Sequence, residues 1–160
     1  MKNVPLSNSR LTAIVSDSDY EKVMKYSWHL RKGRYTNYAF AHVKGETNMG
    51  MHRYILGLVK GELADHKNRN GLDNRRTNLR YCTISQNLAN RRLPKRNSSG
   101  LKGVYYRPLL NKWYAAIYHG KSICLGFFKT KEEAAIAYNK KAKELFGEFA
   151  FQNIVEGSIE

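Results

Sequence analysis

The stretch that decides the fold is ADHKNRNGLDNRRTNLRYCTISQNLANR, residues Ala64 to Arg91. It opens with Asp65-His66, turns at Gly71-Leu72-Asp73-Asn74, and continues through Asn78-Leu79-Arg80 into a short polar helix that starts at Ser85-Gln86-Asn87. The pattern predicts strand, turn, strand and helix. Among its polar side chains, the carboxylate of Asp65, the imidazole of His66 and the carboxamides of Asn78 and Asn87 form a set that suits metal-assisted hydrolysis of phosphodiesters.

The overall charge indicates a polyanionic partner. The 160 residues include 28 Lys+Arg and 13 Asp+Glu, so the formal charge is +15 and the pI is about 9.9. Cationic side chains that neutralise phosphates give nucleic-acid affinity that is independent of sequence. A membrane surface is the alternative partner, but the chain has no amphipathic basic helix and no apolar run long enough to cross a bilayer.

Two further features bear on the compartment. The N-terminus, Met1-Lys2-Asn3-Val4-Pro5, lacks the apolar core of a signal peptide, so we expect a cytoplasmic protein. Cys82 and Cys124 are far apart and form no CxxC pair. We therefore expect neither a structural zinc site nor a disulfide.

Composition predicts two small domains joined by a basic linker. Residues 91–100, RRLPKRNSSG, hold four Lys+Arg and no acid, contain a proline, and end in Ser-Ser-Gly. Such a segment cannot bury apolar surface. We expect it to lie along a DNA backbone, with a solvated tether as the alternative. The predicted domains are residues 1–90, with a core at 50–90 behind a β-rich extension, and residues 101–155.

The N-terminal extension shows short alternating patterns. We expect strands at Leu11–Val15, Trp28–Leu30 and Tyr35–Val43, with Ala39, Ala41 and Val43 on one face of the last. The remaining expected elements are a helix at Asp17–Tyr26 capped by Asp17 or Ser18, a turn at Glu46–Asn48 and a helical turn at Met51–Gly57.

The C-terminal domain is predicted as a three-stranded antiparallel sheet packed on one helix. The strands are expected at Lys102–Tyr106, Lys112–Tyr118 and Ser122–Phe128, and the helix begins at a capping box, Thr130 to Glu133, and ends at Gly147. Alternation assigns to the core Val104, Trp113, Ala115, Ile117, Ile123 and Leu125. It assigns to the outer face Tyr105, Arg107, Tyr114, Ala116, Tyr118 and Lys121.

The stretch 64–91 resembles the core of the HNH endonuclease family, in its phage and intron-homing branch, because Asp-His, Asn-Leu-Arg and the later Asn recur in order. The resemblance implies an α+β protein with a ββα-metal nuclease domain. It makes His66 the general base, Asn78 a catalytic residue that ties the loop and orients His66, and Asp65 and Asn87 the ligands of Mg²⁺ or Mn²⁺. Asn87 stands where many members have a second histidine, which favours a hard cation over zinc.

Several neighbouring residues are candidates for accessory roles. His52 precedes the core and has either a structural or phosphate-contacting role or a direct catalytic one. Asn90 is a further ligand or a residue of the helix surface, and we favour the surface. We expect phosphate contacts from the arginines around the site and the cations of the linker: Arg69, Arg75, Arg76, Arg80, Arg91, Arg92, Lys95 and Arg96.

The C-terminal domain resembles the DNA-binding domain of plant ethylene-response factors. The matching residues are Gly103-Val104, Lys112-Trp113, Leu125-Gly126-Phe127-Phe128, Glu133-Ala134-Ala135, Ala137-Tyr138 and Asn153. The resemblance implies that the outer face, with Tyr105, Arg107, Tyr114, Tyr118 and Lys121, lies in the major groove of double-stranded DNA. Plant domains carry several arginines and tryptophans where this chain has tyrosines, an alanine and Cys124, so the plant sequence preference does not transfer.

Together these patterns predict a site-specific HNH homing endonuclease that acts as a monomer and nicks one strand. The alternative is a DNA-binding regulator that retains the fold but does not cut. A third interpretation, an RNA-binding or RNA-cleaving protein, suits the charge equally well. The chain lacks the exposed aromatic motifs of common RNA modules, which argues against it.

Overall fold

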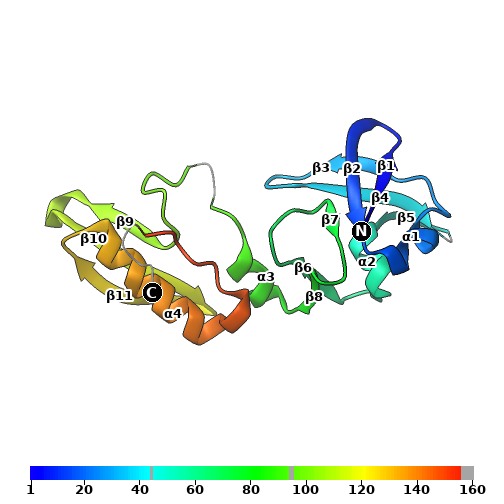
Figure 1. The fold of residues 1–160 in the computed structure, drawn as a ribbon. Coiled ribbons are helices and arrows are strands. Elements are labelled where there is room, and N and C mark those ends of the chain that lie inside the picture. The colour runs from blue at the N-terminus through cyan, green and yellow to red at the C-terminus, as the bar shows by residue number, and fades with distance from the viewer. Residues whose placement is uncertain (44, 94–95, 156–160) are drawn as a thin grey trace. The chain divides into compact units, whose positions relative to one another are not determined.

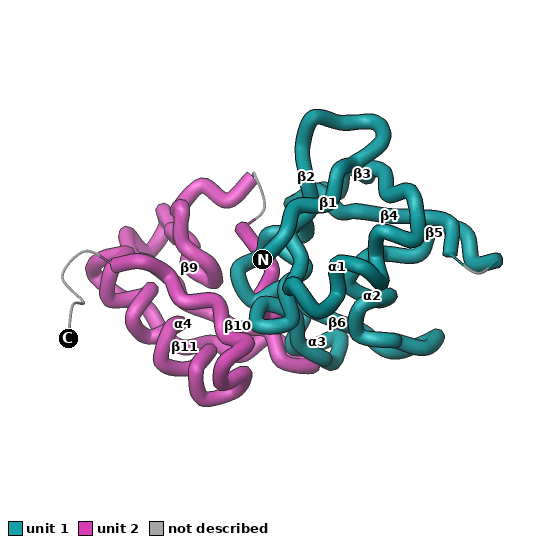
Figure 2. The backbone as a smooth tube through the Cα atoms, turned by 45° about the vertical axis from the view of Figure 1, so that its right-hand side comes forward, with its two compact units in different colours: residues 1–87 teal, residues 88–160 magenta. Residues whose placement is uncertain are grey.

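The chain folds into two compact units in a computed structural model that describes residues 1–43, 45–93 and 96–155. Unit 1 comprises residues 1–87 and unit 2 residues 88–160 (Figure 2). The division falls inside one helix, α3 (Ile84–Asn90), whereas the sequence predicted a first domain that ends at residue 90. Small, mainly antiparallel sheets combined with short helices confirm the predicted α+β class.

Unit 1 contains two three-stranded sheets and one two-stranded sheet (Figure 1). The first sheet consists of β1 (Lys2–Leu6), β2 (Ser9–Val15) and β7 (Asp73–Asn74), in that order. The second consists of β3 (His29–Lys32), β4 (Asn37–Val43) and β5 (Glu46–Gly50). The two-stranded sheet pairs β6 (Leu63–His66) with β8 (Leu79–Cys82). The other helices of this unit are α1 (Asp17–Val23) and α2 (Met51–Leu56). The β2–β7 pair is parallel, and it joins the loop between β6 and β8 to the N-terminal sheet.

The core of unit 1 lies beneath β4 and the N-terminal strands. Ala39, Ala41 and Val43 are buried, which confirms the alternation predicted for that strand. Trp28 and Met51 are among the largest fully buried side chains, at 1% and 0% exposure. Burying a side chain of this size contributes on the order of 2 kcal/mol, so these two residues anchor the helices to the sheets.

Some local predictions for the extension are wrong. Residues 46–48 are not a turn but the start of β5, because their strand pairs with β4. Helix α1 has Ser16 rather than Asp17 or Ser18 at its N-cap, and it ends at Val23. Strand β1 was not predicted, because a five-residue segment that contains a proline, Pro5, carries a weak strand signal.

Unit 2 is a three-stranded antiparallel sheet covered by one helix, as predicted. Its elements are β9 (Val104–Arg107), the 3₁₀ turn η1 (Pro108–Leu110), β10 (Lys112–His119), β11 (Lys121–Phe128), α4 (Lys131–Phe146) and the 3₁₀ turn η2 (Gly147–Phe149). The capping box is confirmed, since the Glu133 amide donates to Thr130 Oγ1 at 3.2 Å and the Thr130 amide donates to Glu133 Oε2 at 3.3 Å. Ala134, Ala135 and Tyr138 are buried on the side of α4 that faces the sheet.

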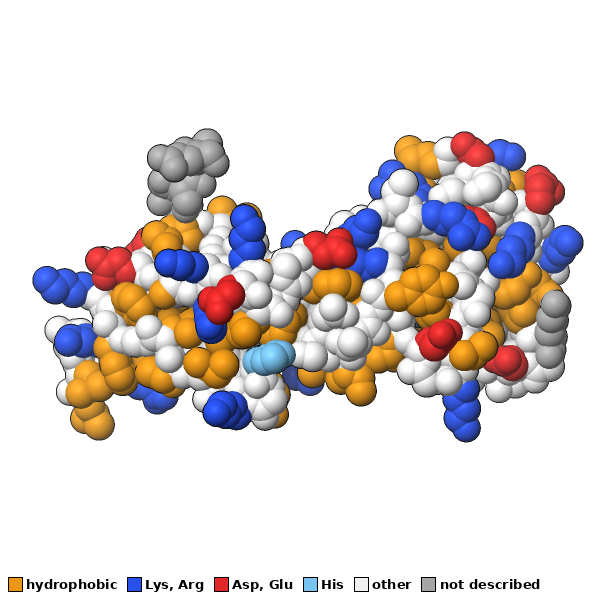
Figure 3. All heavy atoms as spheres, turned by 90° about the horizontal axis from the view of Figure 1, so that it is seen from below, with side chains coloured by type: hydrophobic (Ala, Val, Ile, Leu, Met, Phe, Trp, Pro, Cys, Tyr) orange, Lys and Arg blue, Asp and Glu red, His pale blue; other side chains and the backbone are white. Residues whose placement is uncertain are grey.

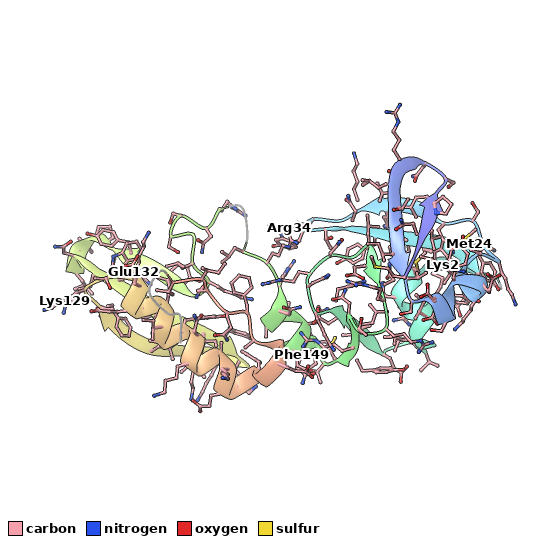
Figure 4. All side chains as sticks on the ribbon, viewed as in Figure 1. Lys2, Met24, Arg34, Lys129, Glu132 and Phe149 are labelled. Atoms are coloured by element: carbon pink, nitrogen blue, oxygen red, sulfur yellow. The ribbon has the colours of Figure 1, made fainter. Side chains whose placement is uncertain are left out.

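Helix α4 runs along one face of that sheet (Figure 1). Lys129 and Glu132 mark its N-terminal end and Phe149 lies beyond its C-terminal end (Figure 4). The opposite face of the sheet is not covered by α4. Strand β10 is central, so its side chains alternate between the helix side and this outer face.

The segment before β9 is held at both ends. Lys102 Nζ donates to the carbonyl oxygens of Leu88, Ala89 and Arg91 at 3.3, 2.6 and 2.8 Å, where the C-terminal carbonyls of α3 favour a cation. The Lys102 amide donates to Asn153 Oδ1 at 2.6 Å. The described part of residues 91–100 is therefore a loop with anchored ends rather than a solvated tether. Pro94 and Lys95 lie outside the described residues.

Gly103 offers a test of this packing. Its φ is +72°, and a Cβ there would overlap the Tyr138 ring and lie 2.5 Å from the Ala116 carbonyl oxygen. Gly120 has nearly the same φ, +70°, but a Cβ added to it would meet nothing within 4 Å. We expect Gly120→Ala to cost about 1 kcal/mol through backbone conformation alone, and Gly103→Ala to cost roughly 2 kcal/mol more through overpacking. Native-state hydrogen exchange of β10 amides measures both losses; equal losses would contradict the packing described.

Candidate active site

Asp65 is buried at the end of β6 and is paired with a cation. The antiparallel register with β8 sets it opposite Arg80, whose Nη2 and Nε lie 2.7 and 3.0 Å from Asp65 Oδ2. The side chains are 7% and 9% exposed. Removing one partner of such a pair leaves an uncompensated buried charge, at a cost of about 3–5 kcal/mol. Arg80, predicted to contact phosphate, is therefore engaged by the carboxylate predicted to bind metal.

His66 follows on the same strand and is oriented by an asparagine that sequence reasoning missed. Its Nε2 lies 3.2 Å from Oδ1 of Asn74, which is 0% exposed. The Asn74 amide nitrogen faces the Gly71 carbonyl at 3.5 Å, so its oxygen faces the imidazole. An amide oxygen only accepts, so Nε2 carries the proton and the imidazole lone pair is on Nδ1. The only signal in the sequence was an asparagine in a predicted turn.

Two other rings pack against this imidazole. The ring centroid of His66 lies 5.1 Å from that of His52 on α2 and 5.9 Å from that of Tyr38 on β4. Burial lowers the pKa of His66, while the Asn74 hydrogen bond and the nearby carboxylates offset part of that effect. Burial, and then the charges of His66 and Arg53, lower the pKa of His52 to about 3. Both imidazoles are thus neutral at pH 7, the state a proton acceptor needs.

Asn78 ties the loop between β6 and β8. Its Nδ2 donates to the Asp73 carbonyl oxygen at 2.7 Å and to Asn68 Oδ1 at 3.0 Å, while its Oδ1 accepts from the Asn68 amide at 3.0 Å. Its carbonyl oxygen accepts from the Lys67 amide at 2.9 Å. These bonds hold the backbone that directly follows His66. Asn78 therefore acts on the imidazole through the loop, whereas Asn74 contacts it directly.

Helix α3 carries the two other predicted asparagines. It begins at Ile84, one residue before the predicted start, with a reciprocal cap in which the Thr83 and Gln86 side chains each accept from the other's amide at 3.2 and 2.8 Å. Asn87 is exposed one turn later. Asn90 is 5% exposed, so the surface position that we favoured for it is wrong. The physical reason is that the chain folds back over the helix end, where Lys102 binds the carbonyls.

The arginines around the loop form internal ion pairs. Arg75 pairs with Asp73 through Nη2 and Nε, at 2.6 and 2.7 Å, and these bonds lower the pKa of Asp73. Arg76 pairs with Asp19 at 2.8 Å through two nitrogens. Arg69 is partly buried in a left-handed turn at φ 62°, its amide bonded to the His66 carbonyl oxygen. The guanidinium groups of Arg75 and Arg76 thus form ion pairs within unit 1, a structural role that the sequence did not predict.

The predicted metal ligands offer oxygen donors only. Among the described residues, no three His, Cys, Asp or Glu side chains gather into a possible metal site. The predicted pair is one carboxylate, Asp65, and one amide, Asn87, which fit Mg²⁺ or Mn²⁺ better than zinc. A cation at Asp65 would share that carboxylate with Arg80. Cys82 and Cys124 form no disulfide within the described residues, and burial raises the pKa of Cys82 to about 11, which leaves it unreactive.

The predicted DNA contacts of unit 2 are mostly exposed. Arg91, Arg92, Arg96, Tyr105, Arg107 and Tyr118 are exposed and Tyr114 is half-buried, while Lys95 lies outside the described residues. The outer-face position predicted for Lys121 is wrong. Lys121 pairs with His119, whose ring contacts Phe146 of α4, and paired residues of an antiparallel sheet lie on the same face, so Lys121 lies on the helix side. On the surface seen in Figure 3, basic side chains are spread over both units. No described helix is long and apolar enough to span a bilayer.

Comparison with known proteins finds a viral relative. A protein of Acanthamoeba polyphaga mimivirus, described as an uncharacterized HNH endonuclease, is 35% identical over 150 residues. The aligned region covers 90% of this chain and 75% of the relative. No family model matches the chain. No solved structure matches it either.

The buried His52 predicts a pH-dependent stability. Its pKa is about 3 in the folded protein against an ordinary value of 6.5, so between these pH values only the unfolded chain binds the proton. The contribution of His52 to the free energy of unfolding is fully present above pH 6.5 and falls as pH falls toward 3, by about 2 kcal/mol at pH 5. Urea midpoints at pH 7, 6 and 5 measure this loss.

We expect His52→Phe to reduce that pH dependence, since the ring volume is kept and one titrating group is removed; the remainder comes from His66, whose pKa is also lowered by burial. The matched control is His42→Phe, at an exposed position on the neighbouring strand, which should leave the dependence unchanged. An undiminished slope in His52→Phe would refute the assignment.

Proposed function

The chain belongs to the HNH endonuclease family, and we propose from this that it is a site-specific homing endonuclease that hydrolyses DNA with His66 as general base. The observation that carries the proposal is the imidazole itself: it is buried, neutral, and held by Asn74 beside Asp65. A surface histidine in a turn would have none of these restraints. Such restraint is what a catalytic base requires, because misplacement of the acceptor atom slows proton transfer.

The chain's own residues would divide the reaction as follows. His66 Nδ1 accepts the proton of the attacking water, and Asn74 keeps the opposite nitrogen protonated. Asn78 holds the loop between β6 and β8 closed, and so limits movement of the imidazole. Asp65 and Asn87 would hold a divalent cation, Mg²⁺ or Mn²⁺, which would supply positive charge to the scissile phosphate.

We propose double-stranded DNA as the substrate and unit 2 as its reader. The support is the basic connection of residues 91–96, the exposed outer face of the sheet, and the resemblance to ethylene-response-factor domains. One Asp-His-Asn set can align one scissile phosphate, so we propose a monomer that nicks one strand. The setting we propose is the cytoplasm of a host cell, consistent with a viral relative.

The second candidate is a DNA-binding regulator that does not cut. One observation favours it: Arg80 already compensates the charge of Asp65, the carboxylate proposed to bind metal. The two functions separate in one assay, in which supercoiled plasmid carrying the target locus is incubated with and without Mg²⁺. Metal-dependent nicked circles indicate the nuclease, and unchanged supercoiled DNA with a retarded band in a gel indicates the regulator.

Substitution of the proposed base should separate cutting from binding. We expect His66→Ala to lower the nicking rate by about 100-fold or more, with DNA affinity within a few fold. Asp65→Asn should also lower the nicking rate; it keeps a hydrogen-bond acceptor for Arg80 but removes the compensating charge, so circular dichroism must show that the variant is folded. His42→Ala, at an exposed histidine, is the control and should nick normally. Normal nicking by His66→Ala would refute the role of His66, and linear product without a nicked precursor would refute the monomeric nickase.

The cations of the connection should set the salt dependence of binding. We expect Arg91→Gln, Arg92→Gln and Arg96→Gln together to weaken binding to all sequences. They should lower the slope of log K against log salt concentration by up to about 3 units, since each phosphate contact contributes about 0.9. The matched control replaces three exposed lysines of α4, Lys131, Lys140 and Lys143. Equal effects of the two triple variants in fluorescence anisotropy titrations would contradict the proposed path of the DNA.

A further inference from the structure

We propose that the outer face of the unit 2 sheet selects duplex DNA by apolar contact with the C5-methyl groups of thymine in the major groove. The outer face is defined by Tyr105, Tyr114, Ala116, Tyr118, Cys124 and Phe127. This inference rests on the proposed function, in which unit 2 reads double-stranded DNA. The inference adds which base is recognised, thymine, and how it is recognised, by apolar contact.

Register places these side chains on one surface. Tyr114 is paired with Tyr105 on β9 and with Phe127 on β11, and Ala116 is paired with Cys124. The alternate residues of β10, Ala115 and Ile117, are buried on the helix side at 0% and 4% exposure. The outer face therefore crosses all three strands. Tyr105, Tyr118 and Phe127 remain 50%, 68% and 47% exposed, a large apolar area for a surface that α4 does not cover.

The chemistry of the outer face suits methyl groups better than hydrogen-bonding base edges. Its centre is the methyl of Ala116 and the thiol of Cys124, bordered by aromatic carbon. Reading guanine requires a guanidinium or ammonium group directed at O6 and N7. The cross-strand pair Arg107 and Lys112 lies at one edge, and the Arg107 guanidinium lies over the Tyr114 ring at 5.0 Å. Thymine is the base whose major-groove edge carries a methyl group, and alanine and phenylalanine are suitable contacts for it.

Ring geometry favours this over stacking on unpaired bases. The centroid of Tyr114 lies 6.5 Å from that of Tyr105 and 5.2 Å from that of Phe127, with interplanar angles of 36° and 43°. The three rings are thus tilted against one another, and the Arg107 guanidinium lies over a face of the central Tyr114 ring. Base stacking on a single strand requires open ring faces, whereas a methyl group can fit between ring edges. Unit 2 also has 13 basic and 6 acidic residues, so phosphate attraction can hold a duplex while the outer face selects the sequence.

The test removes only the methyl group. Full-length protein in EDTA, where no strand is cut, is titrated by fluorescence anisotropy against an alternating d(A-T) duplex and the matching d(A-U) duplex, in which uracil lacks the C5-methyl. We expect the d(A-U) duplex to bind about fourfold more weakly for each methyl contacted. Equal affinity for the two duplexes overturns the proposal. Tighter binding of single-stranded oligo(dT) than of either duplex overturns it in favour of stacking.

Substitutions locate the effect. Phe127→Ala should reduce the d(A-T) to d(A-U) ratio toward one, and Tyr118→Ala, at a more exposed position, gives a second variant should the first fail to fold. The matched control is Ile136→Ala, which removes a 52% exposed apolar side chain from α4 and should leave the ratio unchanged. A ratio preserved in both outer-face variants overturns the assignment to this surface. Discrimination between the d(A-T) and d(A-U) duplexes without plasmid nicking would support this proposal and refute the nuclease function. Plasmid nicking without that discrimination would support the nuclease function and refute this proposal.

Discussion

The hydrogen bonds of Asn78 are the constraint on which the rest of unit 1 depends. This one buried side chain holds Asn68 and the Asp73 backbone, and so closes the long connection between β6 and β8. Closure positions Asp73 and Asn74 to pair with β2, and Asn74 in turn reaches His66. Each buried polar group left without a partner costs about 1–3 kcal/mol, so the network forms as a whole. The orientation of the imidazole is thereby a property of the entire loop.

Desolvation explains why the basic residues divide into two groups. Asp19, Asp65 and Asp73 are buried, and a buried carboxylate needs a partner. Guanidinium groups from the loop and β8 supply those partners, so their charge is compensated within unit 1 even where, as in Arg76, the side chain is half exposed. The cations that directly follow α3, Arg91 and Arg92, are exposed and form the second group. Counting arginines near a site in the sequence therefore overestimates the charge that unit 1 can present to phosphate.

Local patterns account for the elements that the sequence predicted, and distant contacts account for those it did not. Alternation along β4 and the capping box of α4 are local signals, and both are confirmed. The two-residue strand β7 exists only because β2, far earlier in the chain, pairs with it. The contact of Asn74 with His66 depends on closure of the loop between β6 and β8, and the burial of Asn90 accompanies the return of the chain at Lys102 to the end of α3. Residue types at the candidate site could be predicted, but the partners of each side chain could not.

The parallel pairing of β2 with β7 bears on how the candidate active site could be transferred to another protein. A minimal fragment of residues 50–90 would carry Asp65, His66 and Asn78 but leave behind the strand against which Asn74 is held. Transplanted onto another protein, such a fragment would keep the motif and lose its scaffold. A fragment that keeps the loop intact therefore includes the N-terminal strands as well as the motif, because β2 pairs with the segment that contains Asn74.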